Sequence, residues 1–118
     1  MRILDISPLR GSAARALTDH LVDEEPVHAA YSAASGAVLF TDRRILLVTR
    51  EHLLEEKVET TSWPWRALRH FAIQEGAGGR GSVRIWLGDE PQPLQLRAEG
   101  EVLHPLQQLL ARMLPPFG

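Results

Sequence analysis

The chain has 118 residues, about the size of one domain, and 44% of them are hydrophobic against 24% charged, which excludes a wholly disordered protein. Its 13 basic and 15 acidic side chains give a net charge of −2, without the basic bias of most nucleic-acid binders, so we expect no nucleic-acid partner. The lack of cysteine excludes disulfides and cysteine-bound zinc. No secretory leader or membrane-length apolar run is visible, so we expect a cytoplasmic protein.

Short elements follow one another along the chain. Residues 1–12 contain proline and glycine without a clear period, which predicts an irregular N-terminal arm ahead of a single domain over 13–118. Apolar residues at helical spacing over 13–23 predict a short helix that ends before Pro26. Alternating or apolar runs then predict seven short strands, at 27–31, 37–41, 44–49, 57–62, 69–75, 82–87 and 94–97.

The tail returns to helical spacing. Its apolar stripe consists of Val102, Leu103, Leu106, Leu109, Leu110, Met113 and Leu114. Pro105 is expected in the first turn, where its missing N–H costs nothing. Seven antiparallel strands and a closing helix predict a mainly β (α+β) fold, a small barrel or sandwich capped by the helix.

A family resemblance rests on three segments. Residues 39–48, Leu-Phe-Thr-Asp-Arg-Arg-Ile-Leu-Leu-Val, resemble the hairpin of small stand-alone bacterial pleckstrin-homology (PH) domains, and segments 62–71 and 83–87 are similar to later parts of that family. The resemblance covers about residues 14–114. It implies a seven-stranded, bent antiparallel barrel plugged by the C-terminal helix, and the family is associated with ring-like homo-oligomers.

Arginines near one turn offer a candidate anion contact. Lipid-binding relatives of PH domains place basic residues in the first strand loop, and loop 32–36 has none, which argues against headgroup binding. Arg43, Arg44 and Arg66 could still contact an acidic lipid, so membrane recruitment is our alternative function. The competing interpretation is a polar turn with Arg44 paired at its strand end.

We expect neither catalysis, nor a cofactor, nor a metal site. The glycine-rich loop 76–81 precedes a strand instead of a helix, which predicts a hairpin loop and not a phosphate cradle. The five histidines have no metal-ligand spacing, and no nucleophile-elbow motif is present. Carboxylate pairs such as Glu24 and Glu25 are interpreted as exposed turn residues. An enzyme or carrier would need a pocket, which the sequence neither reveals nor excludes.

Aromatic residues suggest a protein contact. Trp63 and Trp65 flank Pro64, so we expect them to point different ways, with one in the core. Trp86 falls on the polar face of its strand beside Arg84, and such residues are typical of interface hot spots. The alternative is that Trp86 packs under Trp65 or the N-terminal helix.

One strand also predicts a covered outer surface. Residues 45–48 are apolar on both faces, so their outer face needs a cover, either the N-terminal helix or another subunit. The leading hypothesis is a non-catalytic interaction module that forms a homo-oligomer, with a different protein as the alternative partner. Its interface candidates are Leu46, Val48, Trp65, Arg84 and Trp86.

Overall fold

The computed structural model describes residues 2–9, 20–51 and 57–116. In these ranges the chain forms two β-sheets, the short 3-10 helices η2 (Trp65–Ala67) and η3 (Ala77–Gly79), and the C-terminal helix α2 (Gly100–Met113). The strands are β1 (Arg2–Asp5), β2 (Ser7–Pro8), β3 (Val27–Ala33), β4 (Gly36–Thr41), β5 (Arg44–Glu51), β6 (Lys57–Pro64), β7 (Leu68–Glu75), β8 (Arg80–Leu87) and β9 (Leu94–Glu99). The strand order is β2-β3-β4-β5-β6 in the first sheet and β1-β9-β8-β7 in the second.

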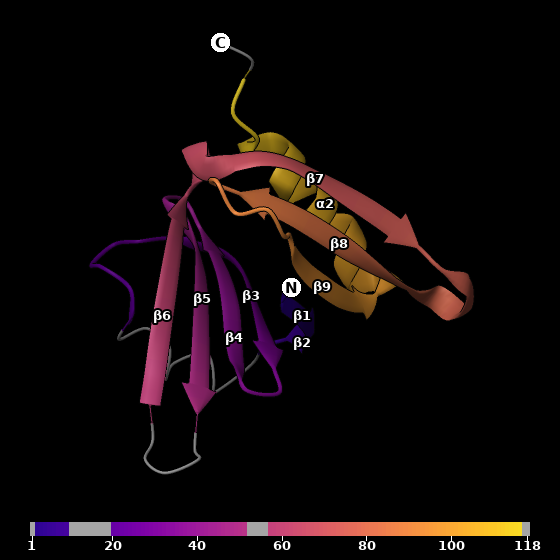
Figure 1. The fold of residues 1–118 in the computed structure, drawn as a ribbon, viewed down its shortest axis with the longest axis horizontal. Helices are drawn as coiled ribbons and strands as arrows, with labels where there is room; N and C mark the ends of the chain where they lie inside the picture. Colours follow the sequence, from indigo (N-terminus) through magenta and orange to yellow (C-terminus); the bar gives the residue numbers. More distant parts are fainter. Residues whose placement is uncertain (1, 10–19, 52–56, 117–118) are drawn as a thin grey trace.

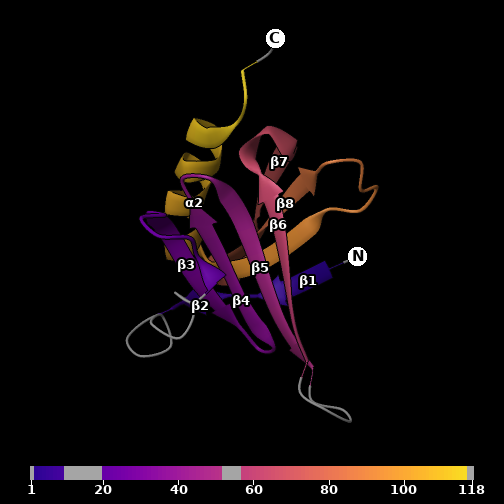
Figure 2. The ribbon, with the colours of Figure 1, turned by 90° about the vertical axis from the view of Figure 1, so that its left-hand side faces the viewer.

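The two sheets meet at a steep angle, with η2 at the corner between β6 and β7 (Figure 1). Strands β3 to β6 form one antiparallel meander, which faces the viewer in Figure 2, and β7 to β9 form another. Seven consecutive antiparallel strands followed by one helix confirm the predicted mainly β, PH-like fold. The two sheets bend around a core without closing into one continuous barrel.

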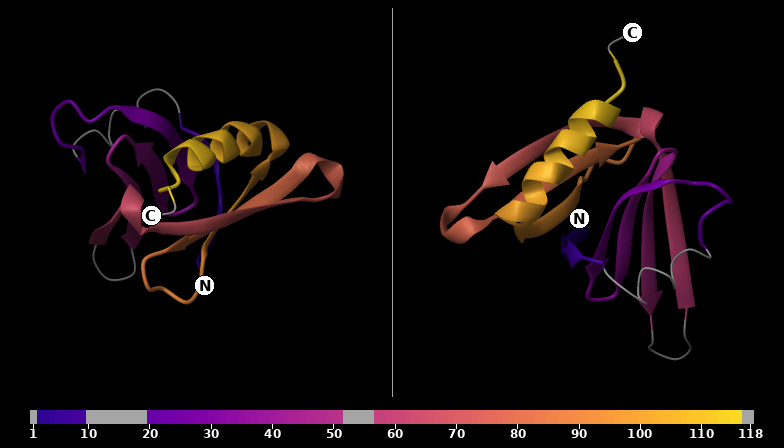
Figure 3. Two further views of the ribbon diagram at one scale, coloured as in Figure 1. Left: turned by 90° about the horizontal axis from the view of Figure 1, so that it is seen from above. Right: turned by 180° about the vertical axis from the view of Figure 1, so that it is seen from behind.

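The main core lies between the two sheets and α2, which crosses the second sheet on one side (Figure 3). The stripe predicted on the tail is its helical wall, because α2 buries Val102, Leu103, Leu106, Leu109 and Leu110. The facing wall is β8, where every second residue points inward and is no more than 1% exposed: Val83, Ile85 and Leu87. The period of two in β8 therefore decides which of its residues remain outside.

The helix starts earlier than its proline suggested. α2 begins at Gly100, so Pro105 lies in the second turn, and the prediction of a first-turn proline is wrong. Pro105 has no N–H to donate to the carbonyl of Glu101 four residues before it. Both residues are exposed, so water can take that bond, which explains why the helix tolerates the proline.

The N-terminal residues are more regular than predicted. β1 pairs in parallel with β9, and β2 pairs antiparallel with β3, so the segment 2–8 joins one edge of each sheet. Ile6 between them is 6% exposed and belongs to the core. The prediction of an irregular arm is therefore wrong. The sequence did not reveal these strands because 4 and 2 residues are too few to show an alternation of apolar and polar side chains. The helix predicted over 13–23 lies mostly outside the described residues.

Candidate functional site

One face of the second sheet is left open. α2 covers the inner side of β7, β8 and β9, and Figure 1 shows no helix or strand in front of the opposite side. The outward residues of β8 are Ser82, Arg84 and Trp86, as their alternation with the buried residues predicts. His70 of β7 lies directly opposite Trp86 in the register of the two strands. The outer face therefore combines aromatic and cationic side chains.

Three of these side chains form a compact group, here called the Trp86 patch: His70, Arg84 and Trp86. The rings of His70 and Trp86 stack with centroids 4.3 Å apart and planes inclined by 20°. The Arg84 guanidinium carbon lies 5.5 Å from the centroid of the Trp86 ring, within the range of a cation–π contact. The Arg84 Nε is buried and has no hydrogen-bond partner among the described residues. The patch thus presents a partly exposed aromatic ring beside a guanidinium group.

A shallow depression lies on the same sheet, beside the η3 hairpin. Its volume is about 490 Å³, and it is lined by Asp5, Gln74, Gly76, Ala77, Arg80, Gly81, Ser82, Gln95 and Arg97. Arg97 donates two hydrogen bonds of 2.9 Å to Asp5, which hold the pKa of that carboxyl below its usual range. Arg80 pairs with Glu99 at 3.1 Å. The charged groups of the depression therefore bind one another.

Chemistry-bearing clusters are few elsewhere in the described part of the chain. No group of three or more metal-ligating side chains is found there. None of its helices is long and apolar enough to cross a membrane. Residues 76–79 join β7 to β8, so the predicted hairpin is confirmed, although Arg80 and Gly81 already belong to β8. Gly78 and Gly79 adopt positive φ angles of 80° and 76° that favour glycine.

Of the three arginines predicted as an anion contact, Arg44 is bound within the chain, while Arg43 and Arg66 are exposed. Arg44 donates from Nε and Nη2 to the two carboxylate oxygens of Glu25, each at 3.0 Å. Its Nη1 donates to Ser62 at 2.9 Å, and its Nη2 also donates to the carbonyl of His20 at 2.9 Å. These bonds engage all three nitrogens of the guanidinium, so Arg44 binds groups of its own chain and is not a free anion contact. The competing interpretation, a polar turn with Arg44 paired at the strand end, is confirmed.

Glu25 is the residue that sequence reasoning placed wrongly. It was interpreted as an exposed turn residue, yet its side chain is fully buried and also accepts a 2.6 Å hydrogen bond from Thr41 Oγ1. The hydrogen bonds from Arg44 lower its pKa from 4.5 to about 2, against the opposing effect of burial. The sequence around Glu24 and Glu25 does not indicate which of the two is buried. Glu25 is the buried one because the fold places Arg44 beside it.

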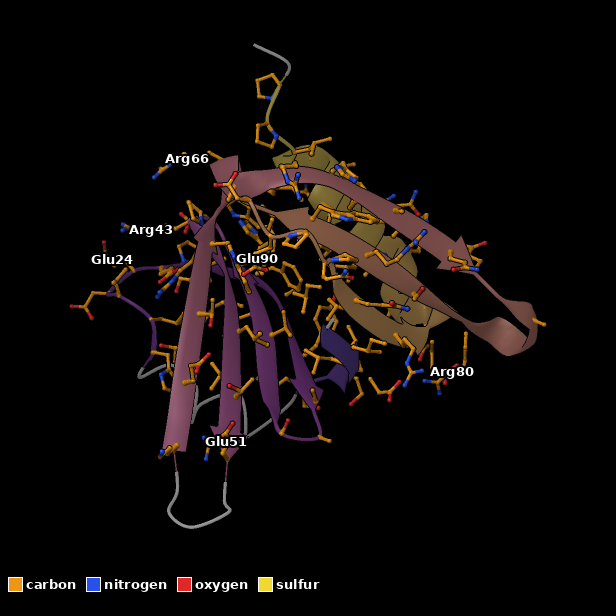
Figure 4. All side chains as sticks on the ribbon, viewed as in Figure 1. Glu24, Arg43, Glu51, Arg66, Arg80 and Glu90 are labelled. Atoms are coloured by element: carbon orange, nitrogen blue, oxygen red, sulfur yellow. The ribbon has the colours of Figure 1, made fainter. Side chains whose placement is uncertain are left out.

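The other two candidate arginines remain at the surface. Arg43 lies in the turn between β4 and β5, where its backbone N–H donates to Thr41 Oγ1 at 3.1 Å, and Arg66 lies in η2. Both side chains are exposed, and Figure 4 shows them extending outward on the same side of the molecule, where Glu24 also extends. This side therefore carries mixed charge.

Two interface candidates lie in a second apolar cluster on the outer face of β4 and β5. Leu46 and Val48 are 1% and 0% exposed, and Ala37 and Leu39 complete the cluster. The residues that pack against it are Leu9, Leu21 and Ala30 of the same chain. The predicted need for a cover is confirmed, and the chain supplies covering residues itself. Leu46 and Val48 are consequently not on the surface that the structure presents.

Trp65 is a core residue, and so is Trp63. Each is 8% exposed, and Trp65 Nε1 donates to the carbonyl of Thr41 at 2.8 Å. The expectation that the two would point different ways is wrong, because Trp63 near the end of β6 and Trp65 at the start of η2 belong to the same core cluster. Of the interface candidates, Arg84 and Trp86 are the ones that lie together on the open face.

His70 was missed as part of this group. The sequence offered it as one of five histidines without a partner, and the resemblance did not single it out. The only signal was the cross-strand register, which depends on the bulge between Leu68 and His70. The open face also excludes the alternative position of Trp86 under Trp65.

Comparison with known proteins identifies the family of the chain and similar folds. The family model for the bacterial PH domain matches residues 6–114. The uncharacterized protein YjqA of Bacillus subtilis (strain 168) is 26% identical over 97 residues, 77% of this chain and 76% of that protein. Among solved structures, a DUF1696 family protein with a pleckstrin-homology domain from Shewanella loihica PV-4 superimposes with a TM-score of 0.74 at 21% identity, covering 96% of this chain and 98% of that one. A pleckstrin homology domain from Shewanella amazonensis SB2B gives a TM-score of 0.64 at 26% identity, covering 87% and 96%.

Proposed function

The chain belongs to the bacterial PH domain family, and from this premise we propose that it is a non-catalytic interaction module that assembles with copies of itself. The proposed contact lies on the β7 side of the second sheet and includes the Trp86 patch. The expectation of ring-like assembly comes from the family resemblance. The observation that carries the proposal is the patch itself. Its partly exposed Trp86 ring stacks on His70, lies under the Arg84 guanidinium and belongs to an open sheet face.

The composition of the patch supports a protein contact. Tryptophan and arginine are enriched among residues that dominate binding energy, because both offer a large contact area together with a polar donor. The Arg84 guanidinium lies 5.5 Å from the centroid of the Trp86 ring, so a partner that contacts the ring also meets a cation. A partner on this face would therefore gain more than the burial of one ring.

A binding role without catalysis also agrees with the polar groups nearby. The charged side chains of the depression on this sheet are paired, Arg97 with Asp5 and Arg80 with Glu99. The PH fold itself is typical of interaction modules. Small-molecule binding would favour an apolar pocket with converging polar groups, and this depression is shallow and polar.

The test is the absolute mass in solution, measured by light scattering on a sizing column over a range of concentrations. We expect a mass of more than one 13.2 kDa chain. Trp86→Ala should lower the mass toward that of one chain, while the control Val58→Ala, at a 46% exposed position of β6, should leave it unchanged. A wild-type monomer at every concentration would contradict self-assembly. An unchanged mass for Trp86→Ala would place the contact elsewhere.

Recruitment to acidic lipids is the second candidate. It now depends on Arg43 and Arg66, since Arg44 is engaged by Glu25. Two exposed arginines give little affinity on their own, at about 1 kcal/mol each near an anionic surface. Sedimentation with phosphatidylserine vesicles at low salt tests this idea. Binding that disappears in Arg43→Ala/Arg66→Ala and in high salt would support it, and no binding at low salt would remove it.

A further inference from the structure

The cover of the second apolar cluster includes a segment that precedes β3. The residues of this cluster are each at most 3% exposed: Ala37, Leu39, Leu46 and Val48. One of the side chains packed against them is Leu21, which belongs to the segment 20–25, here called the strap. The strap therefore contributes to the cover over an apolar face of β4 and β5.

Apolar packing contributes little to the attachment of the strap. Leu21 is only partly buried, and the three residues after it, Val22, Asp23 and Glu24, are exposed. Figure 4 shows Glu24 extending away from the sheets. Glu25 alone among these residues is buried, and its side chain is charged. Because a segment with few buried apolar contacts opens at a low cost in free energy, the polar contacts of Glu25 decide how firmly the strap is held.

These polar contacts converge on Arg44 of β5. Its Nε and Nη2 donate to Glu25 at 3.0 Å, and its Nη2 also donates to the His20 carbonyl at 2.9 Å, so one side chain holds both ends of the strap. Thr41 Oγ1 adds a hydrogen bond of 2.6 Å to Glu25. The desolvation of a buried ion pair offsets much of its attraction. The closed position of the strap thus depends on a small number of polar groups.

The backbone of the strap is strained beside this contact. Glu24 has a φ of 59° and is the one non-glycine residue in the described ranges with a positive φ. A left-handed backbone costs free energy in a residue with a Cβ, and it persists where surrounding contacts impose it. Glu24 itself is exposed, so the contacts that impose it are those of the adjoining Glu25. Opening of the strap relieves this strain.

The strap ends at a fixed point of the first sheet. The carbonyl of Pro26 accepts a 3.1 Å hydrogen bond from the N–H of Asp42, and β3 begins at the next residue. β3 in turn is paired with β4. The chain can therefore change conformation at Glu24 and Glu25 without disturbing the β3 to β6 meander, as a hinge requires.

We propose that the strap is a hinged cover, which opens about Glu24 while both sheets stay folded. The contact between Glu25 and Arg44 closes it, and the strain at Glu24 favours its opening. In the open state Leu21 leaves the second apolar cluster, and Val48 becomes accessible. The strap thereby controls access to an apolar surface of the first sheet. This motion does not require the self-assembly proposed through the Trp86 patch.

Thiol labelling of the full-length chain tests the opening, because the chain has no cysteine of its own. Val48→Cys places a thiol in the second apolar cluster, and Val38→Cys places a matched thiol in the main core, since both valines are 0% exposed and lie on neighbouring strands. Under native conditions we expect a thiol reagent to modify Val48→Cys about tenfold faster or more. Equal rates would overturn the proposal, because a cover that moves only on global unfolding exposes both thiols together.

The dependence of labelling on urea separates local opening from unfolding. Opening of the strap exposes little surface, so the rate for Val48→Cys should change little at low urea concentrations. The rate for Val38→Cys should rise steeply, because its thiol reacts only after global unfolding. A steep rise for both variants would overturn the proposal, even where Val48→Cys is the less stable of the two.

Substitutions in the strap test the contact and the strain separately, each in the Val48→Cys background. Glu25→Gln should raise the labelling rate about tenfold, because hydrogen bonds to a charged group are lost. Glu24→Gly should lower it about threefold, since glycine adopts a positive φ without strain. The control Asp23→Gly, at an exposed position outside the positive range of φ, should not lower it. A rate that Glu25→Gln leaves unchanged, or that both glycines lower equally, would overturn the hinged cover.

Discussion

Two arginines on neighbouring sheets are placed in opposite situations. At the Glu25 corner, here Glu25, Thr41, Arg44 and Ser62, the guanidinium of Arg44 donates from all three nitrogens to groups of its own chain. In the Trp86 patch, the Nε of Arg84 is buried without a partner among the described residues. The first arginine stabilises the fold. The second lies against a partly exposed aromatic ring on the open face, which makes it the better candidate for binding.

The largest expected effect on stability comes from a charge placed in the covered second apolar cluster. Leu46→Asp places a charge at a 1% exposed position in the second apolar cluster, which we expect to cost more than about 4 kcal/mol of unfolding free energy. Circular dichroism in a urea titration measures this. Val58→Asp, at the 46% exposed position of β6, is the control and should change stability by less than about 0.5 kcal/mol. A folded Leu46→Asp chain with an altered mass would return Leu46 to the surface contact.

The second-largest loss of stability is expected when Arg44, whose donors are bound within the chain, is removed. Arg44→Ala leaves the buried Glu25 carboxylate without its main partner, and breaking such a pair costs about 3–5 kcal/mol. The neighbouring Arg43→Ala removes an exposed side chain and should leave stability within about 0.5 kcal/mol of the original. Thermal and urea unfolding of both variants make the comparison. Equal stability of the two would mean that the Glu25 corner contributes little to the fold.

Acid should reproduce part of that loss. The pKa of Glu25 is lowered from 4.5 to about 2 in the folded chain, so its contribution is complete above about pH 4.5 and is lost as the pH falls toward 2. The unfolded chain binds the proton first, which draws the equilibrium toward unfolding. Urea unfolding at neutral pH and in steps down to about pH 3 measures the slope.

Glu25→Gln is the control for the pH effect. It should be less stable at neutral pH and should have a flatter dependence on pH, because its side chain does not titrate. Asp5, whose pKa Arg97 also lowers, leaves a residual slope of the same sign. An unchanged slope would assign the acid sensitivity to other carboxylates.

The smallest effect on stability is expected at the patch. Trp86→Ala removes a cross-strand stack on the open face and should cost at most about 1 kcal/mol. Trp65→Ala empties a position that is 8% exposed and should cost about 3–5 kcal/mol. The pair is compared by chemical unfolding. A cost at Trp86 close to that at Trp65 would make the patch a structural element and not a contact surface.

The sequence was sufficient for patterns of period two and 3.6. The inward residues of β8 and the leucine stripe of α2 were predictable because each repeats over several turns or pleats. The position of Trp65 was not, since β6 ends at Pro64 and a short 3-10 helix starts at Trp65, so no repeating pattern extends across this point. Glu25 was not, because its burial depends on Arg44, a residue distant in the chain. A periodic pattern in the sequence indicates which face of a strand or helix is buried. It does not indicate which residue, distant in the chain, lies opposite a buried charge.

The parallel pairing of β1 with β9 also has a consequence for the order of folding. Asp5 and Arg97 are 92 residues apart, yet they meet at adjacent strands of one sheet. Contacts at this separation carry a large loop-closure cost and form late. During synthesis, the first strand therefore leaves the ribosome without its neighbour and waits for almost the whole chain, while the β3 to β6 meander can form from local contacts. The N-terminal strand should accordingly be the last to dock.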